Sequence, residues 1–441
     1  MSEAAARMIV DRLAQAGYQA LFAGGAVRDR LLGLPAQDFD VATDARPDAV
    51  MGLFPRHNAV GAKFGVVLVH ALDAVVEVAT FRCESGYSDG RHPAQVAYAG
   101  DPRQDVARRD FTINGLLLRP ATGEVLDYVG GRDDLARRLV RAIGDPERRF
   151  QEDHLRMLRA VRFAARLEFT LDPATQAAIT AHAVTIRLIS RERVRDELLK
   201  MLTEGHARRA FELLHLTGLL QQVLPEVARM QGVEQPPQFH PEGDVWTHTL
   251  MMLGGLDALP PPRSPVLALG VLLHDVGKPP TFRRAPDRIR FDRHAAVGAA
   301  IARDISGRLR LSGSQTEAVE ALVAEHMQWP MLPKMRESTR KRFLRQPGIG
   351  DLIELLRLDC QMSHGDLSLY QLARRLLDEL RPEEARPPRL LSGDDLIALG
   401  HHPGPAFHAI LEAVEDAQLE GRLPDRDAAL AFVREHYPVA D

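Results

Sequence analysis

Residues Ala23–Asp40 read Ala-Gly-Gly-Ala-Val-Arg-Asp-Arg-Leu-Leu-Gly-Leu-Pro-Ala-Gln-Asp-Phe-Asp, and this stretch decides the fold of the first part of the chain. The apolar residues Ala20–Ala23 predict a short strand, Gly24-Gly25 a tight turn, and Ala26–Leu32 a helix. Glycine adopts backbone conformations that other residues avoid, and the free N–H groups at a helix N-terminus attract anions. The stretch therefore predicts a binding site for a phosphate group at the turn.

Two carboxylates follow this helix after a Gly-Leu-Pro break. Asp38 and Asp40 stand two residues apart in a run that is expected to be a strand, so both side chains should project from one face. Carboxylates held this close repel each other unless a cation lies between them, and Mg²⁺ bound by carboxylates completes its shell with water and substrate phosphates. With Arg28 placed to meet a triphosphate, the stretch predicts a site for nucleotidyl transfer.

The composition is that of a globular protein rich in helix. The 441 residues exceed one ordinary domain, and 45% hydrophobic with 26% charged residues is typical of soluble proteins. Cys83 and Cys360 lie far apart, which suggests neither a disulfide framework nor a zinc site and fits a reducing cytoplasm. The segment Met1–Gly17 is amphipathic but interrupted by charged side chains, so it predicts neither a signal peptide nor a membrane span. We therefore expect a cytoplasmic protein with no membrane partner.

Local charge differs from the total charge. The formal net charge of −4 argues against indiscriminate coating of nucleic acid. Between Arg137 and Arg166, however, nine arginines face four acidic residues. This run predicts a surface that contacts phosphates, although a solvated helix face has the same pattern.

The hydrophobic pattern divides the chain into two kinds of region. In residues 1–140, strand-like segments at 66–69, 75–80, 112–118 and 125–128 alternate with helical ones, which predicts a mixed sheet with flanking helices. The polar segment between Phe81 and Arg108 is expected to be a mobile loop. From Pro146 onward the pattern is almost wholly helical, beginning with one helix over 146–167.

The first part of the chain resembles the class II tRNA nucleotidyltransferases and bacterial poly(A) polymerases. The resemblance implies an α/β, polymerase-beta-like head, two Mg²⁺ ions held by Asp38 and Asp40, and a triphosphate held by Gly24, Gly25 and Arg28. The matching signature consists of Gly24-Gly25-x-Val27-Arg28-Asp29, Leu32-Gly33 and Asp38-x-Asp40.

Two further motifs are expected to complete this site. Glu77 lies in a β-branched run and would supply a third acidic group from a neighbouring strand, although the spacing fits an exposed edge carboxylate equally well. The segment 108–114 matches the family's second motif almost letter for letter, and Gly115 stands where the family has alanine. The resemblance implies that this motif helps to bind the ribose of the incoming nucleotide. Its nucleotide-binding residues would be Arg108, Arg109, Asp110 and Asn114.

The segment Glu152-Asp153-His154-Leu155-Arg156 predicts recognition of a base. On a helix, Asp153 and Arg156 share a face. A carboxylate accepts a hydrogen bond from an exocyclic amine, and a guanidinium donates to an unprotonated ring nitrogen. Cytosine and adenine present this amine beside this nitrogen, whereas uracil and guanine present the reverse at their pairing edges. The pair therefore predicts acceptance of CTP and ATP, and it resembles the family's Glu-Asp-x-x-Arg base template.

Members of this family add CCA, CC alone or A alone to tRNA, or synthesise poly(A). Gly61–Val67 lacks the consecutive basic residues associated with the polymerases, and the full-length polar segment Cys83–Ala107 argues against a CC-only enzyme. We therefore expect template-independent addition of CCA to tRNA from CTP and ATP, with Tyr87–Arg91 as the lever between C and A. The alternatives are an A-adding enzyme or poly(A) polymerase, and, from another class, an inactive RNA-binding quality-control protein.

A second set of motifs lies in the helical part. His274-Asp275 ends the apolar run Val266–Leu273, and further histidines and an aspartate recur on the segments around it. Such groups on successive helices form a cage for a divalent metal that generates hydroxide at neutral pH. The order His…His-Asp…Asp resembles the HD phosphohydrolase superfamily, which implies phosphodiesterase or phosphatase activity on RNA ends; a degenerate HD domain would only bind RNA. The expected ligands of this metal, whose identity the sequence does not specify, are His248, His274, Asp275, His294, His326 and Asp359.

Four domains are predicted. They are a nucleotidyltransferase head (1–140), a helical region with the base template and RNA contacts (141–230), a helical HD metallohydrolase domain (231–380) and a helical tail (381–441). A Pro- and Gly-rich linker, 231–244, contains His240 and Glu242, which we interpret as loop residues. The expected partners are tRNA, CTP and ATP, and the oligomeric state does not follow from the sequence.

Overall fold

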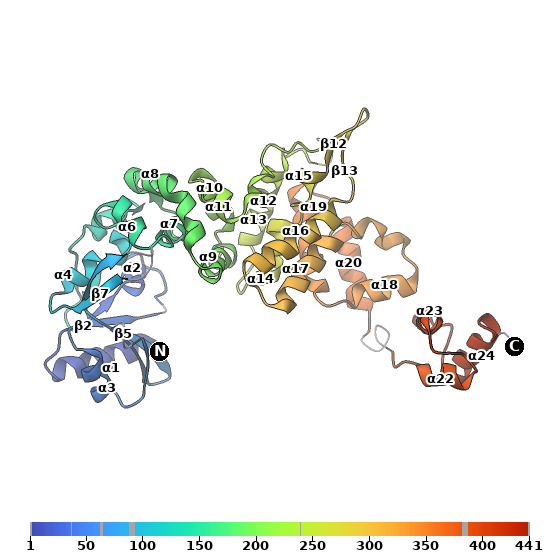
Figure 1. Ribbon diagram of the computed structural model, residues 1–441, viewed down its shortest axis with the longest axis horizontal. Coiled ribbons are helices and arrows are strands. Elements are labelled where there is room, and N and C mark those ends of the chain that lie inside the picture. Colours follow the sequence, from blue (N-terminus) through green and yellow to red (C-terminus); the bar gives the residue numbers. More distant parts are fainter. Residues whose placement is uncertain are drawn as a thin grey trace. The chain divides into compact units, whose positions relative to one another are not determined.

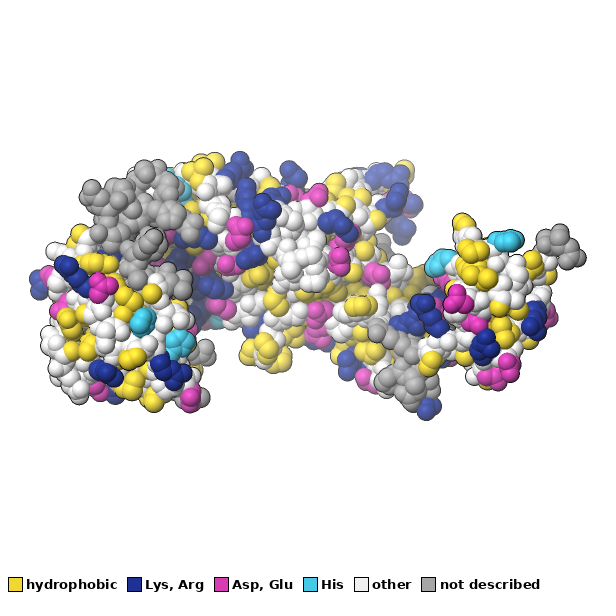
Figure 2. Space-filling view, turned by 60° about the horizontal axis from the view of Figure 1, so that its bottom comes forward, with side chains coloured by type: hydrophobic (Ala, Val, Ile, Leu, Met, Phe, Trp, Pro, Cys, Tyr) yellow, Lys and Arg dark blue, Asp and Glu magenta, His cyan; other side chains and the backbone are white. Residues whose placement is uncertain are grey.

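The computed structural model describes residues 2–36, 38–61, 65–87, 93–238, 240–381 and 387–439. The chain forms two compact units, Met1–Ala228 and Arg229–Asp441, each with its own core (Figure 1). On the face shown in Figure 2, Lys and Arg side chains are mixed with Asp and Glu, in keeping with the small net charge. Within the described part of the chain, no helix has the length and apolar character that a membrane crossing requires.

A seven-stranded mixed sheet organises the first unit. The strand order is β3-β4-β5-β2-β1-β8-β9; β2 and β5 run parallel and the other neighbours run antiparallel. This mixed sheet with flanking helices confirms the predicted α/β head. Its strands are β1 (Ala20–Ala23), β2 (Asp40–Thr43), β3 (His57–Gly61), β4 (Val66–Ala71), β5 (Ala74–Thr80), β8 (Leu117–Arg119) and β9 (Glu124–Leu126).

Helices cover this sheet for reasons visible in the sequence. Helix α1 (Ser2–Gln15) packs on β1, β4 and β5, because its buried residues recur at helical spacing and meet the alternating buried valines of β4. The other helices of the head are α2 (Gly25–Leu31), α3 (Pro47–Leu53), α4 (Pro102–Ala107), the 3-10 helix η2 (Thr112–Asn114) and α5 (Gly131–Ala136). The expectation of a strand over 112–118 is wrong in its first half, because turn hydrogen bonds close η2 and the strand begins only at Leu117.

The expected mobile loop between Phe81 and Arg108 is largely ordered. Strands β6 (Arg82–Tyr87) and β7 (Pro93–Tyr98) pair antiparallel as a hairpin, and α4 follows. The backbone pairing of the two strands supplies the hydrogen bonds that a polar segment with few apolar anchors needs. The proposed lever Tyr87–Arg91 lies mostly outside the described residues, as does the centre of the Gly61–Val67 segment.

The predicted helix over 146–167 is two helices. Helix α6 (Pro146–Glu152) ends at Asp153, which has an extended backbone, and α7 (Arg156–Arg166) begins after it. Asp153 and Arg156, which were expected to share one helix face, therefore lie on either side of the break between α6 and α7. The remaining elements of this unit are β10 (Leu139–Val140), β11 (Thr170–Leu171), α8 (Pro173–His182), η3 (Ala183–Leu188), α9 (Arg191–Thr203), α10 (Ala207–Leu216), α11 (Leu219–Val223) and α12 (Pro225–Ala228).

The second unit is helical, as predicted. Helix α14 packs on α13, α17 and α19, and α16 packs on α17. Glycine permits these close approaches: a methyl group on Gly270 of α14 would lie 2.8 Å from Leu322 of α17. The elements are α13 (Val245–Asp257), α14 (Pro265–Leu273), α15 (Lys278–Thr281), β12 (Phe282–Arg284), β13 (Ile289–Phe291), α16 (His294–Arg308), α17 (Gly313–Glu325), η4 (Trp329–Lys334), α18 (Glu337–Leu344), α19 (Ile349–Met362) and α20 (Ser368–Glu379).

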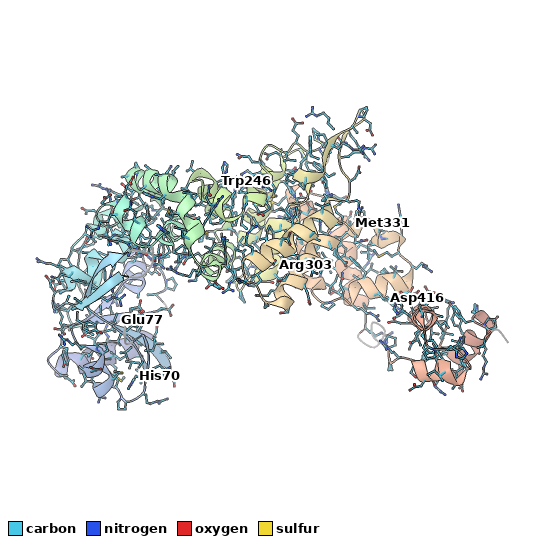
Figure 3. All side chains as sticks on the ribbon, viewed as in Figure 1. His70, Glu77, Trp246, Arg303, Met331 and Asp416 are labelled. Atoms are coloured by element: carbon cyan, nitrogen blue, oxygen red, sulfur yellow. The ribbon has the colours of Figure 1, made fainter. Side chains whose placement is uncertain are left out.

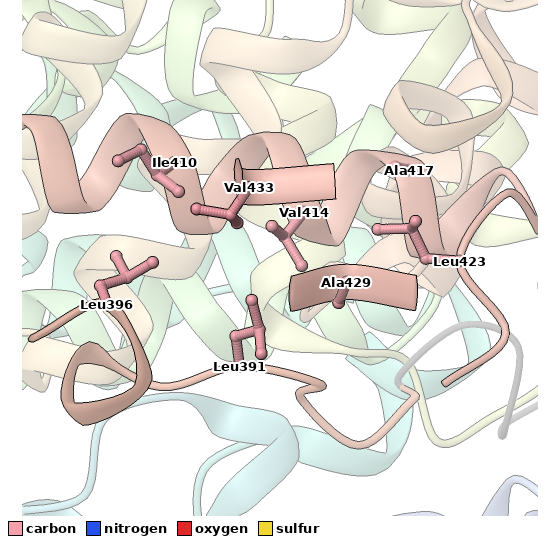
Figure 4. Close-up of a cluster of buried hydrophobic side chains, with 8 residues drawn as sticks. All are labelled: Leu391, Leu396, Ile410, Val414, Ala417, Leu423, Ala429 and Val433. Atoms are coloured by element: carbon pink, nitrogen blue, oxygen red, sulfur yellow. The ribbon is translucent and has the colours of Figure 1, made fainter. Parts of the chain in front are cut away.

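A small C-terminal bundle completes this unit. It consists of α22 (Gly393–Ala398), α23 (Pro405–Leu419) and α24 (Arg426–His436) around the aliphatic cluster drawn in Figure 4. Helix α23 is fastened to α18 by polar contacts, among them Lys341 Nζ to the Leu419 carbonyl at 2.7 Å and Arg342 to Asp416 at 2.5 Å. The tail that the sequence predicted is thus a packed helical cluster with its own apolar core.

Candidate functional site

The turn between β1 and α2 brings together three groups of the predicted transferase site. Ala23 pairs with Asp40 across β1 and β2, and Gly24 follows with a φ of 71°, which favours glycine. A methyl group on Gly24 would lie 3.3 Å from Arg109 Nη1 and 4.0 Å from Asp40 Oδ2. The turn, a carboxylate and a guanidinium therefore meet at the N-terminus of α2.

Asp40 carries the electrostatic signature of this site. The parallel register of Val41 with Val78 places Asp40 beside Glu77, which Figure 3 labels on β5. Burial, the charge of Glu77 and the charge of Asp38 raise the pKa of Asp40 to about 7, despite the opposing charge of Arg109. Carboxylate oxygens are the ligands that hard divalent cations prefer, so Asp40, with Glu77 on the neighbouring strand, is a candidate position for a divalent metal.

The carboxylates of Asp38, Asp40 and Glu77 do not converge on one point in this structure. Asp38 is exposed and lies before β2, which begins at Asp40, and Glu77 is also exposed. Among the described residues, groups of three potential ligand atoms within 4.8 Å of one another occur in the second unit only. The expectation that Asp38 and Asp40 stand in one strand is therefore wrong, because the strand begins only at Asp40 and continues to Thr43.

Arg28 reaches the turn but is buried, and a methyl group on Gly25 would lie 3.6 Å from its Nη2. Its guanidinium is 2% exposed, bonds Asp29 through Nε at 2.7 Å and donates from Nη1 to Asn114 Oδ1 at 2.6 Å. Burial lowers the pKa of Arg28, and Asp29 partly opposes this effect. Such a buried and satisfied side chain joins parts of the head, which does not agree with the prediction that Arg28 contacts a triphosphate.

Asp110 lies in the same buried network. Its Oδ2 accepts two hydrogen bonds from Arg159 of α7, at 2.7 and 2.9 Å, and its Oδ1 accepts from the Phe111 N–H and from Asn114 Nδ2. Burial alone would raise the pKa of Asp110, but Arg159 and these bonds lower it to about 2. Here Asp110 and Asn114 connect the head with α7 and face no open surface, whereas the sequence predicted contacts to ribose.

A buried acid that the sequence did not reveal holds the two motif arginines. Asp105 of α4 is 1% exposed and binds Arg108 through Oδ1 at 2.7 Å and Arg109 through Oδ2 at 3.0 Å. Although burial opposes it, the two arginines keep the pKa of Asp105 below its usual value. Asp105 thereby holds the Arg109 side chain toward the turn. The only indication of this contact in the sequence is the spacing, because Asp105 lies three positions before Arg108 and four before Arg109.

The two base-template residues have separate partners. Arg193 of α9 binds Asp153 at 2.9 Å, whereas Arg156 Nη1 donates to Glu152 Oε2 at 2.9 Å. Arg156 Nη2 also donates to the Arg108 carbonyl at 2.9 Å. The expectation that Asp153 and Arg156 share one helix face is wrong, because Asp153 is extended and precedes α7. Arg193 is an additional residue of this region that spacing did not indicate.

The second unit gathers every histidine that the sequence proposed as a metal ligand. Three of them donate Nδ1–H to the backbone carbonyl three residues earlier: His274 to Val271, His294 to Phe291 and His326 to Val323, at 2.7 to 2.9 Å. His248 instead donates Nδ1–H to Glu242. These bonds leave all four Nε2 atoms as the potential ligand atoms.

The Nε2 atoms converge on Asp275 and Asp359. His248 Nε2 lies 3.2 Å from Asp359, and His274 Nε2 lies 3.1 Å from Asp275; both nitrogens are buried without a well-formed hydrogen bond. The Nε2 atoms of His294 and His326 are 3.3 Å apart, each within 4 Å of Asp275 Oδ1. Imidazole nitrogens and carboxylates gathered in this way fit a divalent metal, and the set is large enough for two.

Three residues beside this centre were not identified from the sequence. Glu242 is 5% exposed in its side chain and accepts Nδ1–H of His248 at 2.7 Å and of His240 at 2.9 Å. Burial alone would raise the pKa of Glu242, yet these bonds lower it to about 2. Lys278 Nζ lies 2.8 Å from Asp275. His240 and Glu242 do lie in an irregular segment, as interpreted, but they contact each other and Glu242 binds His248, which a Pro- and Gly-rich composition conceals.

Family models match this arrangement in order. A poly(A) polymerase head domain matches residues 20–141, a probable RNA and SrmB-binding site of polymerase A matches 168–231, and an HD domain matches 245–358. The CCA-adding enzyme of Levilactobacillus brevis is 46% identical over 216 residues, 49% of this chain and 54% of that protein. The chain thus matches about half the length of this relative.

Other similarities extend over the whole chain. The A-adding tRNA nucleotidyltransferase of Deinococcus radiodurans is 36% identical over 439 residues, 94% of this chain and 95% of that protein. The structure of the Bacillus stearothermophilus CCA-adding enzyme in complex with CTP covers 98% of this chain and 96% of its own, with a TM-score of 0.74 and 27% identity.

Fold and site together define a nucleotidyltransferase head followed by a helical RNA-binding region and an HD domain. With a relative matched along nearly its full length, the chain belongs to the family of class II tRNA nucleotidyltransferases and poly(A) polymerases. The sequence-based prediction of the family is confirmed.

Proposed function

We propose that this chain adds CCA to the 3′ end of tRNA from CTP and ATP without a nucleic-acid template. The observation that carries the proposal is the meeting of Gly24, Asp40 and Arg109 at the N-terminus of α2. Similarity to CCA-adding enzymes, one of them in complex with CTP, supports the choice of substrate.

Different residues of this site bind the triphosphate and the metal. The Gly25 amide and Arg109, which Asp105 clamps, bind the triphosphate, whereas the Gly24 N–H donates to the Leu116 carbonyl and Gly24 serves through its positive φ. Arg109 thereby takes the place that the sequence suggested for Arg28. Asp38, Asp40 and Glu77 would hold Mg²⁺. When bound there, the metal supplies positive charge to the reacting α-phosphate and the leaving pyrophosphate.

Base selection is assigned to Asp153 and Arg156. Their carboxylate and guanidinium match the amine and ring nitrogen that cytosine and adenine share. In the structure both groups are held by other partners, Asp153 by Arg193 and Arg156 by Glu152. An incoming base would therefore replace or share these bonds.

Addition to a tRNA transcript lacking its 3′ end, resolved at single-nucleotide length, tests the proposal. CTP alone should add two nucleotides, and ATP should be required for the third. The Asp40→Asn variant should lose all addition, because it removes an acidic group beside the turn, while His274→Ala should retain it. Extension of no primer by the wild-type chain would refute the transferase function.

A second candidate is addition of A alone. It is favoured by the relative matched over nearly its whole length, which is an A-adding enzyme. In the same assay this activity ignores CTP and extends only tRNA that already ends in CC by one nucleotide.

For the HD centre we propose hydrolysis of phosphate at RNA 3′ ends. Water adds to phosphorus as the bond to the terminal ribose oxygen breaks, which leaves a 3′-hydroxyl and inorganic phosphate. The four Nε2 atoms with Asp275 and Asp359 would hold the divalent metal, which supplies hydroxide at neutral pH. The His274→Ala variant should lose this hydrolysis and keep nucleotide addition.

We further propose the four-domain division at residues 140, 230 and 380, and a cytoplasmic location. The family models over 20–141, 168–231 and 245–358 follow this division to within one residue at 140 and 230, and tRNA processing by the named relatives suits the cytoplasm.

A further inference from the structure

The β12–β13 hairpin leaves the helices of the second unit directly after the HD motif. Figure 1 shows it projecting beyond α15 and α16. Phe282 pairs with Phe291, Arg283 with Arg290, and Arg284 with Ile289. A two-stranded ribbon of this length is marginal by itself and contributes little to a core, so its exposed side chains need another explanation.

The hairpin is strongly basic. Residues 282–293 contain five arginines and two aspartates, and the register sets Arg283 directly opposite Arg290. Like charges facing one another across strands are unfavourable, and here exposed acids compensate them: Asp292 binds Arg283, and Asp287 binds Arg290. Ion pairs this exposed contribute little, so a phosphate can replace the carboxylates readily.

An aromatic pair connects these arginines with the metal centre. Phe282 is 38% exposed and lies 5.9 Å from the Phe291 ring. Phe291 contacts the imidazole of His294, accepts its Nδ1–H through the backbone carbonyl, and lies 5.4 Å from Lys278 Nζ. The hairpin therefore both orients one metal-site histidine and presents an aromatic face and guanidinium groups beside it.

We propose that the β12–β13 hairpin binds single-stranded RNA and delivers its 3′ end to the HD centre, an inference that rests on the hydrolysis proposed for that centre. Arginines in a row meet successive phosphates, and the exposed Phe282 at the end of this row stacks on a base. Stacking requires an unpaired base, which favours a single strand over a duplex. The substrate is accordingly a polynucleotide end and not a free nucleotide.

Kinetics of the full chain with Mn²⁺ test the proposal. The substrates are a single-stranded hexaribonucleotide with a 3′-phosphate and the small monoester p-nitrophenyl phosphate. The variant Arg283→Gln/Arg288→Gln should raise KM for the hexamer at least tenfold and lower its kcat/KM relative to that of the small monoester by the same factor. The dependence of log kcat/KM on log salt should become shallower by about 1.4, because each lost phosphate contact contributes about 0.7.

The control variant is Arg374→Gln/Arg422→Gln, which removes the same charge from two exposed, ion-paired arginines of the same unit. Equal behaviour of the two variants would overturn the proposal. An acidic heptapeptide that competes better than the hexamer would also overturn it and indicate a protein partner.

A binding measurement separates this inference from the hydrolysis on which it rests. If the wild-type chain hydrolyses neither substrate, the proposed HD hydrolase function is refuted. Photo-crosslinking of a hexamer containing 4-thiouridine then tests separately whether the hairpin binds RNA. We expect a crosslink within residues 282–293 that is lost in the hairpin variant and kept in the control. Absence of this crosslink from the wild-type chain would refute RNA binding by the hairpin.

Discussion

Replacement of Asp110 by asparagine is the sharpest test of the network that joins the head to α7. The substitution preserves size and leaves an oxygen that accepts the Phe111 N–H, but it removes the negative charge that Arg159 binds twice. Arg159 then keeps its partly buried position without an ionic partner. We therefore expect a loss of stability in the first unit.

The magnitude follows from the pKa of Asp110. Its value is about 2 in the folded protein and 3.8 ordinarily, a difference that corresponds to about 2 kcal/mol. Because the folded-state pKa is depressed, this stabilisation is present above pH ~4 and is lost as the pH falls toward ~2. The Arg159 side chain is 34% exposed, so the stability lost in the Asp110→Asn variant should stay below the 3–5 kcal/mol that removing one partner of a fully buried ion pair costs.

The chain contains an internal control for this measurement. Both tryptophans, Trp246 and Trp329, belong to the second unit, and Figure 3 labels the first of them on α13. In urea titrations, circular dichroism follows both units, whereas tryptophan fluorescence follows the second. The Asp110→Asn variant should lower the dichroism midpoint at pH 7 and leave the fluorescence midpoint in place.

The pH dependence decides between ionic and steric causes. The difference between wild type and variant should shrink between pH 5 and pH 2.5, because the wild-type carboxylate then takes up a proton. A difference that stays constant over this range, or a variant as stable as the wild type at pH 7, would refute the reasoning.

Three further predictions concern the HD centre and the base template. Glu242→Gln should weaken Mn²⁺ binding about 10- to 100-fold in calorimetric titration, since it disturbs the bond that orients His248, and an unchanged affinity would contradict that role. Gly277→Ala should destabilise the second unit by about 1–3 kcal/mol in tryptophan-detected unfolding, because the new methyl group would lie 2.1 Å from a backbone oxygen of α16. The control is Gly307→Ala within α16, where a new methyl group meets open space and should not destabilise the unit. Asp153→Asn should reduce the preference for CTP over UTP about tenfold or more in single-nucleotide addition, because a carboxamide both donates and accepts; an unaltered preference would remove Asp153 from base selection.

Short-range patterns predicted much of this fold. The strand at Ala20–Ala23, the glycine turn at Gly24 and the helix after it follow from residues that lie within a few positions of one another. The HD cluster was also predictable, because its histidines lie at helix ends, with His274 directly after the apolar helix α14, and the packing of these helices brings their ends together. Local structure and burial are what hydrophobic periodicity encodes.

Partners distant in sequence were not predictable in the same way. The break after Glu152, the pairing of Asp110 with Arg159 and that of Asp153 with Arg193 depend on contacts between side chains 40 or more positions apart, or on an extended residue within a helical pattern. Arg28 illustrates the physical reason. An arginine after a glycine turn has the same local sequence whether it faces a ligand or, as here, a buried carboxylate.

For the proposed addition of CCA, the bonds around α7 bear on how the base preference changes from C to A. Arg156 holds the backbone of Arg108, and Arg159, one turn further along the same helix, holds Asp110. The second motif of the head and the guanidinium of the base template are thus fixed to one another, and moving one against the other would break buried, charged hydrogen bonds that are costly to leave unmade. Asp153 is different, because it lies at the break between α6 and α7 and its partner comes from α9. We therefore expect the base preference to change through Asp153 and its bond to Arg193, with Arg156 as the fixed half of the template.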